Sequence, residues 1–180
     1  AASDVYKRQV MGLGRFGGGA GVARWLARQG AQVHVTDQSP AEALTASLDG
    51  LQSLIDRGKI TLRLGGHAQA DFPACDLVVA NPAIPKPWQN EHLLAAGAGG
   101  VPLTTEIRLL IERLDHRRVI GITGTAGKST TAAMIHHVLS RAGRRSHLGG
   151  NIGGSLLNHL DEIRPGDWIV LELSSAMLHW

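Results

Sequence analysis

A glycine-rich loop with a lysine lies in the second half of the chain. The sequence Gly-Ile-Thr-Gly-Thr-Ala-Gly-Lys-Ser-Thr-Thr occupies residues 121–131, after the apolar pair Val119-Ile120. Small residues let successive backbone N–H groups face one anion, and a following helix adds the positive end of its dipole. Lys128 can bring a full positive charge to a phosphate, and the Ser129 hydroxyl can coordinate a magnesium ion that bridges phosphates. The pattern predicts a nucleotide phosphate loop.

The spelling of this loop narrows the class of nucleotide-binding protein. Counting back from Gly127 puts Ile122, not glycine, at the first position of the strict G-x-x-x-x-G-K-[ST] pattern, and the nearer glycine is Gly124. The spelling T-G-[TS]-x-G-K-[ST]-[ST] resembles the ATP loop of the Mur ligases, the amide-forming enzymes of peptidoglycan synthesis, and of their folylpolyglutamate synthetase relatives. The resemblance implies that these residues bind ATP: Gly124, Thr125, Ala126, Gly127, Lys128, Ser129 and Thr130.

A second glycine cluster lies near the start of the chain. Residues 12–17 match G-x-G-x-x-G between a predicted strand and a predicted helix, and Asp37 follows 23 positions after Gly14. This spacing is typical of dinucleotide folds, in which an acidic residue about 20 positions on meets a ribose hydroxyl. The cluster alone favours an NAD-dependent dehydrogenase, but any nucleotide diphosphate meets the same geometric requirement. A glycine turn without a ligand also stays open.

In the D-glutamate-adding Mur ligases the N-terminal Rossmann-like domain holds the UDP of the substrate. The sequence 81–85, Asn-Pro-Ala-Ile-Pro, resembles the family's S-P-G-I-P loop with alanine in place of glycine, and Arg15-Phe16 departs from the family's aliphatic–threonine pair. The resemblance implies that these residues bind the UDP-substrate: Gly14, Arg15 and Phe16 at the diphosphate, Asp37 and Gln38 at the uridine, with Ala83 and Asn151.

Two further motifs follow the ATP-type loop. Gly-Gly-Asn-Ile-Gly at 149–153 is similar to a family motif whose asparagine contacts the muramoyl substrate, which implies that role for Asn151. Glu172 ends an apolar strand, and a carboxylate there can reach a magnesium ion held by Ser129. Glu-Leu-Ser-Ser at 172–175 is close to the spelling of the D-glutamate-adding branch. The predicted catalytic residues are Lys128, Asn151 and Glu172, and the predicted metal ligands are Ser129 and Glu172.

The elements that must position these residues alternate between strand and helix, which predicts an α/β protein with parallel sheets. Strands are expected at 9–12, 32–36, 60–64, 77–80, 119–122, 145–148 and 168–173, and helices at 18–29, 40–57 with a break at Asp49-Gly50, 89–98, 104–114, 128–142 and 154–159. We expect a leader at 1–9 that need not be native, a Rossmann-like UDP-binding domain at 10–114, and a truncated P-loop-type ATP-binding central domain at 115–180.

Composition excludes several other classes. The 180 residues are 43% hydrophobic and 18% charged, with a formal net charge of +3 from scattered basic residues, so no nucleic-acid surface is expected. The nine histidines lack zinc-like spacing, and the single cysteine excludes an internal disulfide. No apolar run approaches the roughly 20 residues of a membrane span. We expect a cytoplasmic monomer.

The resemblance covers nearly the whole chain after Gln9. It implies an ATP-dependent ligase that joins D-glutamate to UDP-N-acetylmuramoyl-L-alanine through an acyl phosphate, with ATP and Mg²⁺ as cofactors. We expect the chain to be part of a longer parent and inactive alone. An NAD(P)-dependent oxidoreductase and a non-catalytic nucleotide-binding module remain alternatives.

Overall fold

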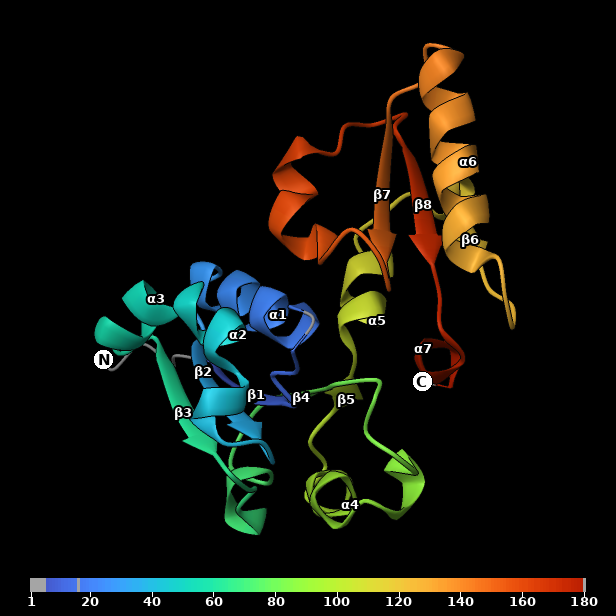
Figure 1. Cartoon of the computed structure of the whole chain (residues 1–180). Coiled ribbons are helices and arrows are strands. Elements are labelled where there is room, and N and C mark those ends of the chain that lie inside the picture. The colour runs from blue at the N-terminus through green and yellow to red at the C-terminus, as the bar shows by residue number, and fades with distance from the viewer. Residues whose placement is uncertain (1–5, 16, 180) are drawn as a thin grey trace. The chain divides into compact units, whose positions relative to one another are not determined.

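The structure is a computed structural model that describes residues 6–15 and 17–179 (Figure 1). It divides into two compact units, Ala1–Glu106 and Ile107–Trp180. The division falls within helix α5 (Glu106–Ile111), a few residues before the charged turn at 115–118 where the sequence predicts a domain boundary.

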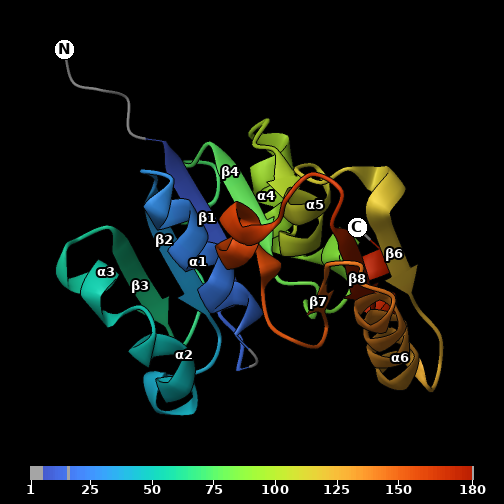
Figure 2. The ribbon, with the colours of Figure 1, turned by 90° about the horizontal axis from the view of Figure 1, so that it is seen from above.

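The first unit is built on a parallel sheet with strand order β3-β2-β1-β4-β5, of which Figure 2 shows β3, β2, β1 and β4 side by side. The chain runs outward from β1 to β3 and then returns to the other side of β1, so the order of connection reverses between β1 and β4. This doubly wound topology confirms the predicted Rossmann-like fold, in which ligands bind at the carboxyl ends of the strands beside that reversal. The strands are β1 (Lys7–Met11), β2 (Gln32–Asp37), β3 (Ile60–Leu64), β4 (Leu77–Ala80) and β5 (Leu103–Thr104).

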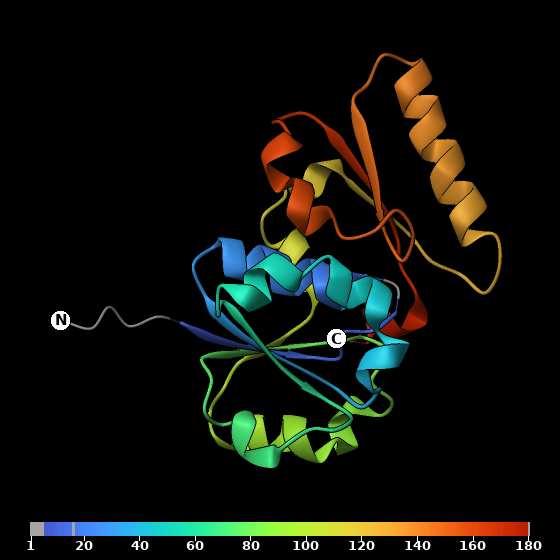
Figure 3. The same ribbon diagram turned by 60° about the vertical axis from the view of Figure 1, so that its left-hand side comes forward.

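Helices cover both faces of this sheet. Figure 3 shows the blue and cyan helices α1 (Gly18–Arg28), α2 (Thr45–Asp49) and α3 (Gln52–Asp56) on one face and the green helix α4 (Glu91–Ala98) on the other. Because both faces are covered, the central strands are apolar and buried, as Val10, Val33 and Val78 show. This core fixes the strand ends from which the first glycine loop projects.

The single helix predicted at 40–57 is wrong in extent, although its break is confirmed. The segment forms a 3₁₀ turn η1 (Ala41–Ala43) followed by α2 and α3. Arg24 of α1 donates hydrogen bonds to the Gly50 carbonyl at 3.0 and 3.3 Å, and a Cβ at Gly50 would lie 2.4 Å from Arg24 Nη2. Glycine at the break therefore leaves room for the Arg24 guanidinium.

The second unit contains a parallel three-stranded sheet with order β6-β8-β7. Its strands are β6 (Val119–Ile122), β7 (Ser146–Gly150) and β8 (Trp168–Glu172), and helix α6 (Lys128–Arg141) lies along the sheet (Figure 1). The 3₁₀ segment η5 (Leu156–Glu162) lies between β7 and β8, and the short helix α7 (Ser175–Leu178) follows β8. Remaining 3₁₀ turns are η2 (Gln69–Asp71), η3 (Pro87–Gln89) and η4 (His116–Arg118).

Three further predicted helices begin later than expected. The helix predicted from residue 89 starts at Glu91, after its N-cap Asn90. The helix predicted from residue 104 starts at Glu106, because Leu103 and Thr104 pair with Val78 and Val79 of β4 as strand β5. The helix predicted from residue 154 starts at Leu156, because Gly154 adopts a positive φ of 81° that no right-handed helix accepts.

Candidate functional site: two nucleotide loops

The lysine loop joins β6 to α6 in the second unit. Gly127 is the N-cap of α6 in the left-handed conformation, with φ 75°, and Gly124 has φ 148°. Both conformations favour glycine, which explains the spacing of the two residues. The 14-residue helix begins at Lys128, so its unpaired N–H groups face the loop, as an anion site requires.

The lysine itself folds back over the loop. Lys128 Nζ donates a hydrogen bond of 2.8 Å to the carbonyl oxygen of Gly124, its own loop residue. The ammonium group therefore lies above the glycine turn, within reach of a phosphate bound there. The other loop residues, Thr125 and Ala126, are exposed, as is Thr130 in the first turn of α6.

Glu172 lies at the end of the central strand, between the loops that follow its two neighbours. The register pairs Glu172 with Ile122 of β6 on one side and with Gly150 of β7 on the other. The chain leaves β6 into the lysine loop and leaves β7 into Asn151. Parallel pairing therefore gathers these predicted residues at one edge of the sheet.

Side-chain hydrogen bonds connect this group directly. Ser129 Oγ donates to Glu172 Oε2 at 2.8 Å, and Asn151 Nδ2 donates to Glu172 Oε1 at 3.1 Å. The backbone N–H of Asn151 also donates to the backbone carbonyl of Glu172 at 2.8 Å. Glu172 is only 1% exposed, so its carboxylate is held by two donors in a buried position. A hydroxyl and a carboxylate oxygen at this separation are a donor set suited to a magnesium ion.

Gly150 allows this close approach. It adopts φ 94°, and a Cβ there would lie 2.2 Å from the carbonyl oxygen of Glu172. A side chain at this position would push Asn151 away from the carboxylate. The glycines of 149–153 are thus explained by packing at the strand end as well as by a turn.

The first glycine loop follows β1 in the first unit. Gly14 has φ 67°, and its amide donates to Asp37 Oδ2 at 3.0 Å, while Asp37 Oδ1 accepts from the Ser39 amide at 2.8 Å. Asp37 is 8% exposed and ends the neighbouring strand β2. The predicted pair Gly14 and Asp37 therefore meets, with the carboxylate bonded to the loop backbone.

Three other predicted UDP-binding residues belong to the loops at the carboxyl ends of β1, β2 and β4. Arg15, Gln38 and Ala83 are all exposed, and the Ala83 amide donates to Asn81 Oδ1 at 2.9 Å. Phe16 lies outside the described residues.

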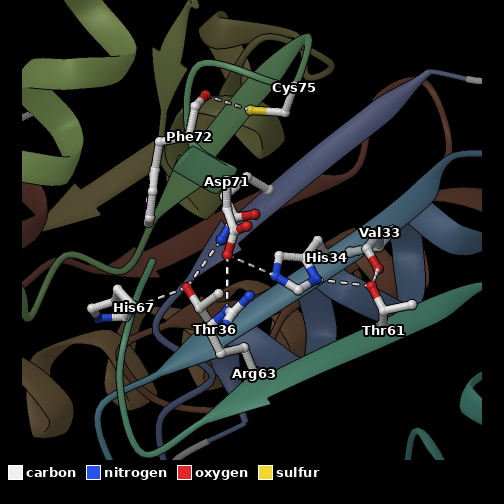
Figure 4. A network of polar contacts seen from close by, with 10 residues as sticks. Val33, His34, Thr36, Thr61, Arg63, His67, Asp71, Phe72 and Cys75 are labelled. Atoms are coloured by element: carbon white, nitrogen blue, oxygen red, sulfur yellow. Dashed lines mark hydrogen bonds and ion pairs between the residues drawn. The ribbon is translucent and has the colours of Figure 1, made fainter. Parts of the chain in front are cut away.

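A polar network on the α4 side of the first sheet was not predicted (Figure 4). His67 Nδ1 lies 2.8 Å from Thr36 Oγ1, which also accepts a 3.0 Å hydrogen bond from Gln9 Nε2. Thr36 Oγ1 therefore joins Gln9 of β1 to His67, and the imidazole tautomer decides which of the Thr36 and His67 groups donates. Burial, and then the neighbouring His92, lower the pKa of His67, while Asp37 acts in the opposite direction.

The same figure shows how η2 is attached to the sheet. Asp71 Oδ2 lies 3.0 Å from Arg63 Nε and 3.2 Å from His34 Nε2, and His34 Nδ1 lies 2.8 Å from Thr61 Oγ1 (Figure 4). Strand alternation at β2 and β3 could have placed these residues on one face, but only the fold brings Asp71 to them. The described residues contain no group of three or more histidine, cysteine or acidic side chains arranged to hold a metal ion.

These features define the class of protein. The first unit is Rossmann-like with a glycine loop, and the second brings a lysine loop, a serine hydroxyl and a buried carboxylate together at one edge of its sheet. Both arrangements are typical of nucleotide-binding α/β proteins. No helix among the described residues combines the length and apolarity needed to cross a membrane.

Comparison with known proteins specifies the family. Residues 6–105 match the family described as Mur ligase MurD-like, N-terminal domain. The chain belongs to this family.

Its relatives are considerably longer than the chain. It is 40% identical over 178 residues to a UDP-N-acetylmuramoylalanine–D-glutamate ligase of Anaeromyxobacter dehalogenans, covering 99% of the chain and 37% of that ligase. It is 41% identical over 169 residues to the ligase of the same name from a Roseiflexus strain, covering 94% of the chain and 35% of the relative. The chain thus spans little more than a third of these relatives.

A solved structure supports the fold alone. The Neisseria UDP-N-acetylmuramate:L-alanyl-γ-D-glutamyl-meso-diaminopimelate ligase superposes with a TM-score of 0.56 at 20% identity, covering 94% of this chain and 52% of that one.

Proposed function

We propose that this chain is the nucleotide-binding portion of an ATP-dependent ligase that adds D-glutamate to UDP-N-acetylmuramoyl-L-alanine. The observation that carries the proposal is the position of Glu172, whose carboxylate accepts hydrogen bonds from Ser129 of the lysine loop and from Asn151. The similarity to ligases of that name over nearly the whole chain supports the same substrate class.

Each predicted site residue of the second unit would have a role in this chemistry. The loop amides and Lys128 would bind the ATP phosphates and stabilise charge on the transferring phosphoryl group, and Asn151 would orient the substrate carboxylate beside it. Ser129 and Glu172 would hold the Mg²⁺ ion, which supplies charge neutralisation for the phosphates. No nucleophilic side chain is required, because the substrate carboxylate would attack the γ-phosphate and release ADP, and the amino group of D-glutamate would then displace phosphate from the acyl phosphate.

The first unit would bind the UDP moiety. The loop 12–17 and the first turn of α1 would bind the diphosphate, with Arg15 and Phe16 beside it, and Asp37, Gln38 and Ala83 would contact the uridine side. The family match over residues 6–105 favours this ligand over a nicotinamide dinucleotide. We propose that the protein acts as a monomer in the cytoplasm and binds no nucleic acid.

Calorimetric titration of the 180-residue chain tests the binding half of the proposal. We expect independent binding of UDP-N-acetylmuramoyl-L-alanine and of MgATP, with Lys128→Ala removing only the second. Binding of NADH with no binding of the UDP-substrate would instead identify an oxidoreductase.

A chimera tests the catalytic half. The chain would replace the matching 178 residues of the Anaeromyxobacter ligase, and ADP release would be followed with D-glutamate and a panel of other amino acids. We expect D-glutamate-dependent turnover by the chimera and none by the chain alone. A chimera that binds both nucleotides without turnover would favour a non-catalytic nucleotide-binding module.

A further inference from the structure

The first glycine loop is oriented by two side chains that the proposed function leaves unassigned. Ser47 Oγ in α2 donates a 2.7 Å hydrogen bond to the carbonyl oxygen of Gly14. Asn81 Nδ2, just after β4, donates a 3.2 Å hydrogen bond to the carbonyl oxygen of Gly12. The two donors come from different parts of the first unit and reach the two glycines that flank Leu13.

The carbonyl of Leu13 also faces the protein, toward the first turn of α1. A Cβ placed on Gly19, in the first turn of α1, would lie 2.4 Å from the carbonyl oxygens of both Gly12 and Leu13. These two oxygens therefore face α1, and only a glycine at position 19 admits them. Three successive carbonyls, at residues 12, 13 and 14, are thus directed at protein groups.

This orientation matters for a loop that binds a diphosphate. A carbonyl oxygen carries partial negative charge and repels phosphate, whereas an N–H group attracts it, so an anion-binding loop has to keep its carbonyls turned away from the anion. A flexible glycine loop does not hold that orientation unaided. Hydrogen bonds that fix the carbonyls on the protein side both lower their negative potential and reduce the ordering cost of binding.

Two further hydrogen bonds, one from the backbone of Asn81 and one to its side chain, hold this residue in place. Its backbone amide donates to the Met11 carbonyl at 2.8 Å, and its Oδ1 accepts from the Ala83 amide at 2.9 Å. A Cβ on Gly12 would lie 2.7 Å from Asn81 Cβ, so the loop and the asparagine lie against each other. Ser47 is 6% exposed, which shields its hydrogen bond from water.

We propose that Ser47 and Asn81 are positioning residues for the diphosphate: they hold the carbonyls of Gly14 and Gly12 away from it and so remove the repulsion between these oxygens and phosphate. Neither side chain needs to touch the ligand. The inference rests on the proposed binding of a uridine diphosphate by the first unit.

The experiment compares UDP with uridine on the intact 180-residue chain. UDP affinity is measured by calorimetry, and uridine affinity by NMR titration at millimolar concentration, for wild type, Ser47→Ala and Asn81→Ala. Loss of one such hydrogen bond should weaken UDP binding about three- to tenfold. Uridine binding should stay within about twofold, because uridine lacks the group that the carbonyls would repel.

Matched controls separate positioning from general loss of structure. Thr45→Ala removes an exposed hydroxyl from the same helix, where it donates only to the carbonyl of Glu42 at 3.1 Å, and should leave UDP affinity unchanged. Ser47→Thr keeps the hydroxyl and should recover most of the UDP affinity lost in Ser47→Ala. MgATP affinity, which reports on the second unit, should be the same in every variant.

The outcomes distinguish this inference from the proposed function. If wild type binds UDP and both alanine variants bind it equally well, or lose uridine and UDP in the same proportion, the positioning role is refuted while the ligand assignment stands. If wild type binds neither UDP nor UDP-N-acetylmuramoyl-L-alanine, both fail together. Should Asn81→Ala not fold, Ser47→Ala with its threonine counterpart decides the question alone.

Discussion

Glu172→Gln separates a metal-binding role from a structural one. Glutamine is nearly isosteric: its Oε1 can still accept from Asn151, and the Ser129 hydroxyl can rotate to accept from the new amide. Two charge-assisted hydrogen bonds become neutral ones, but the cost of burying a carboxylate at 1% exposure disappears. We expect the free energy of unfolding to change by less than about 1 kcal/mol.

The effect on magnesium should be much larger. A single negative charge about 4 Å from a doubly charged ion, at an effective dielectric constant of about 20, interacts by roughly 8 kcal/mol, which is an upper bound because the ion must shed part of its hydration. Even a fifth of this value corresponds to more than tenfold in affinity. We therefore expect the Mg²⁺-dependent part of ATP binding to fall at least tenfold.

Calorimetry with ATP in the presence of Mg²⁺ and in EDTA measures this difference, and urea unfolding measures stability. The Mg²⁺-free affinity should not fall in the variant, because the substitution removes a negative charge from beside the phosphates. The metal assignment would be rejected by an unchanged Mg²⁺ dependence in a folded Glu172→Gln protein. A loss of several kcal/mol of stability with no change in the ratio of the two affinities would show that Glu172 only supports the fold.

Three other perturbations follow from the geometry. Lys128→Ala should weaken ATP binding roughly ten- to 100-fold, measured by calorimetry, with little change in melting temperature, because the Lys128 ammonium donates its hydrogen bond within its own loop. Gly150→Ala should cost at least about 2 kcal/mol in urea unfolding, because φ is 94° and the new Cβ meets the Glu172 carbonyl; an unchanged midpoint would contradict this packing. His67 should make the first unit less stable in mild acid. Its pKa is lowered in the folded state, so the unfolded chain binds more protons. The contribution of neutral His67 to the free energy of unfolding is therefore complete above about pH 6.5 and is lost as the pH falls below that value. Unfolding curves at pH 7.5 and 5.5 should differ less for His67→Gln than for wild type, and an equal difference would exclude His67 as the source.

The strand ends that carry the chemistry could be predicted from the sequence. The limits of β3, β4 and β6 are those predicted, and β4, which is buried along most of its length, is a continuous apolar run. The grouping of Ser129 and Glu172 followed from parallel pairing next to a phosphate loop. Such signals are local in sequence and need no knowledge of distant contacts.

The contacts that were missed depend on distant parts of the chain. Ser47 lies in a helix whose limits were predicted only as part of one long segment, and nothing in its neighbours indicates that its hydroxyl reaches Gly14. The break at Gly50 was visible as a turn, but the hydrogen bonds that its carbonyl accepts come from Arg24, 26 residues earlier. His67 likewise finds Thr36 across 31 residues.

Both units contain a hydrogen bond between a glycine loop and a buried carboxylate, but the two bonds differ in their donors. In each, a buried carboxylate at the end of a neighbouring strand accepts a hydrogen bond from the glycine loop: Asp37 from the Gly14 amide, and Glu172 from the Ser129 hydroxyl. The first bond uses a backbone amide and fixes the loop, and Asp37 has its other oxygen bonded to Ser39. The second leaves the loop amides free, and its hydroxyl can turn from the carboxylate to a shared cation. Asp37 is thereby suited to shape a loop and accept a ribose hydroxyl, whereas Glu172 is suited to hold a metal ion against phosphate.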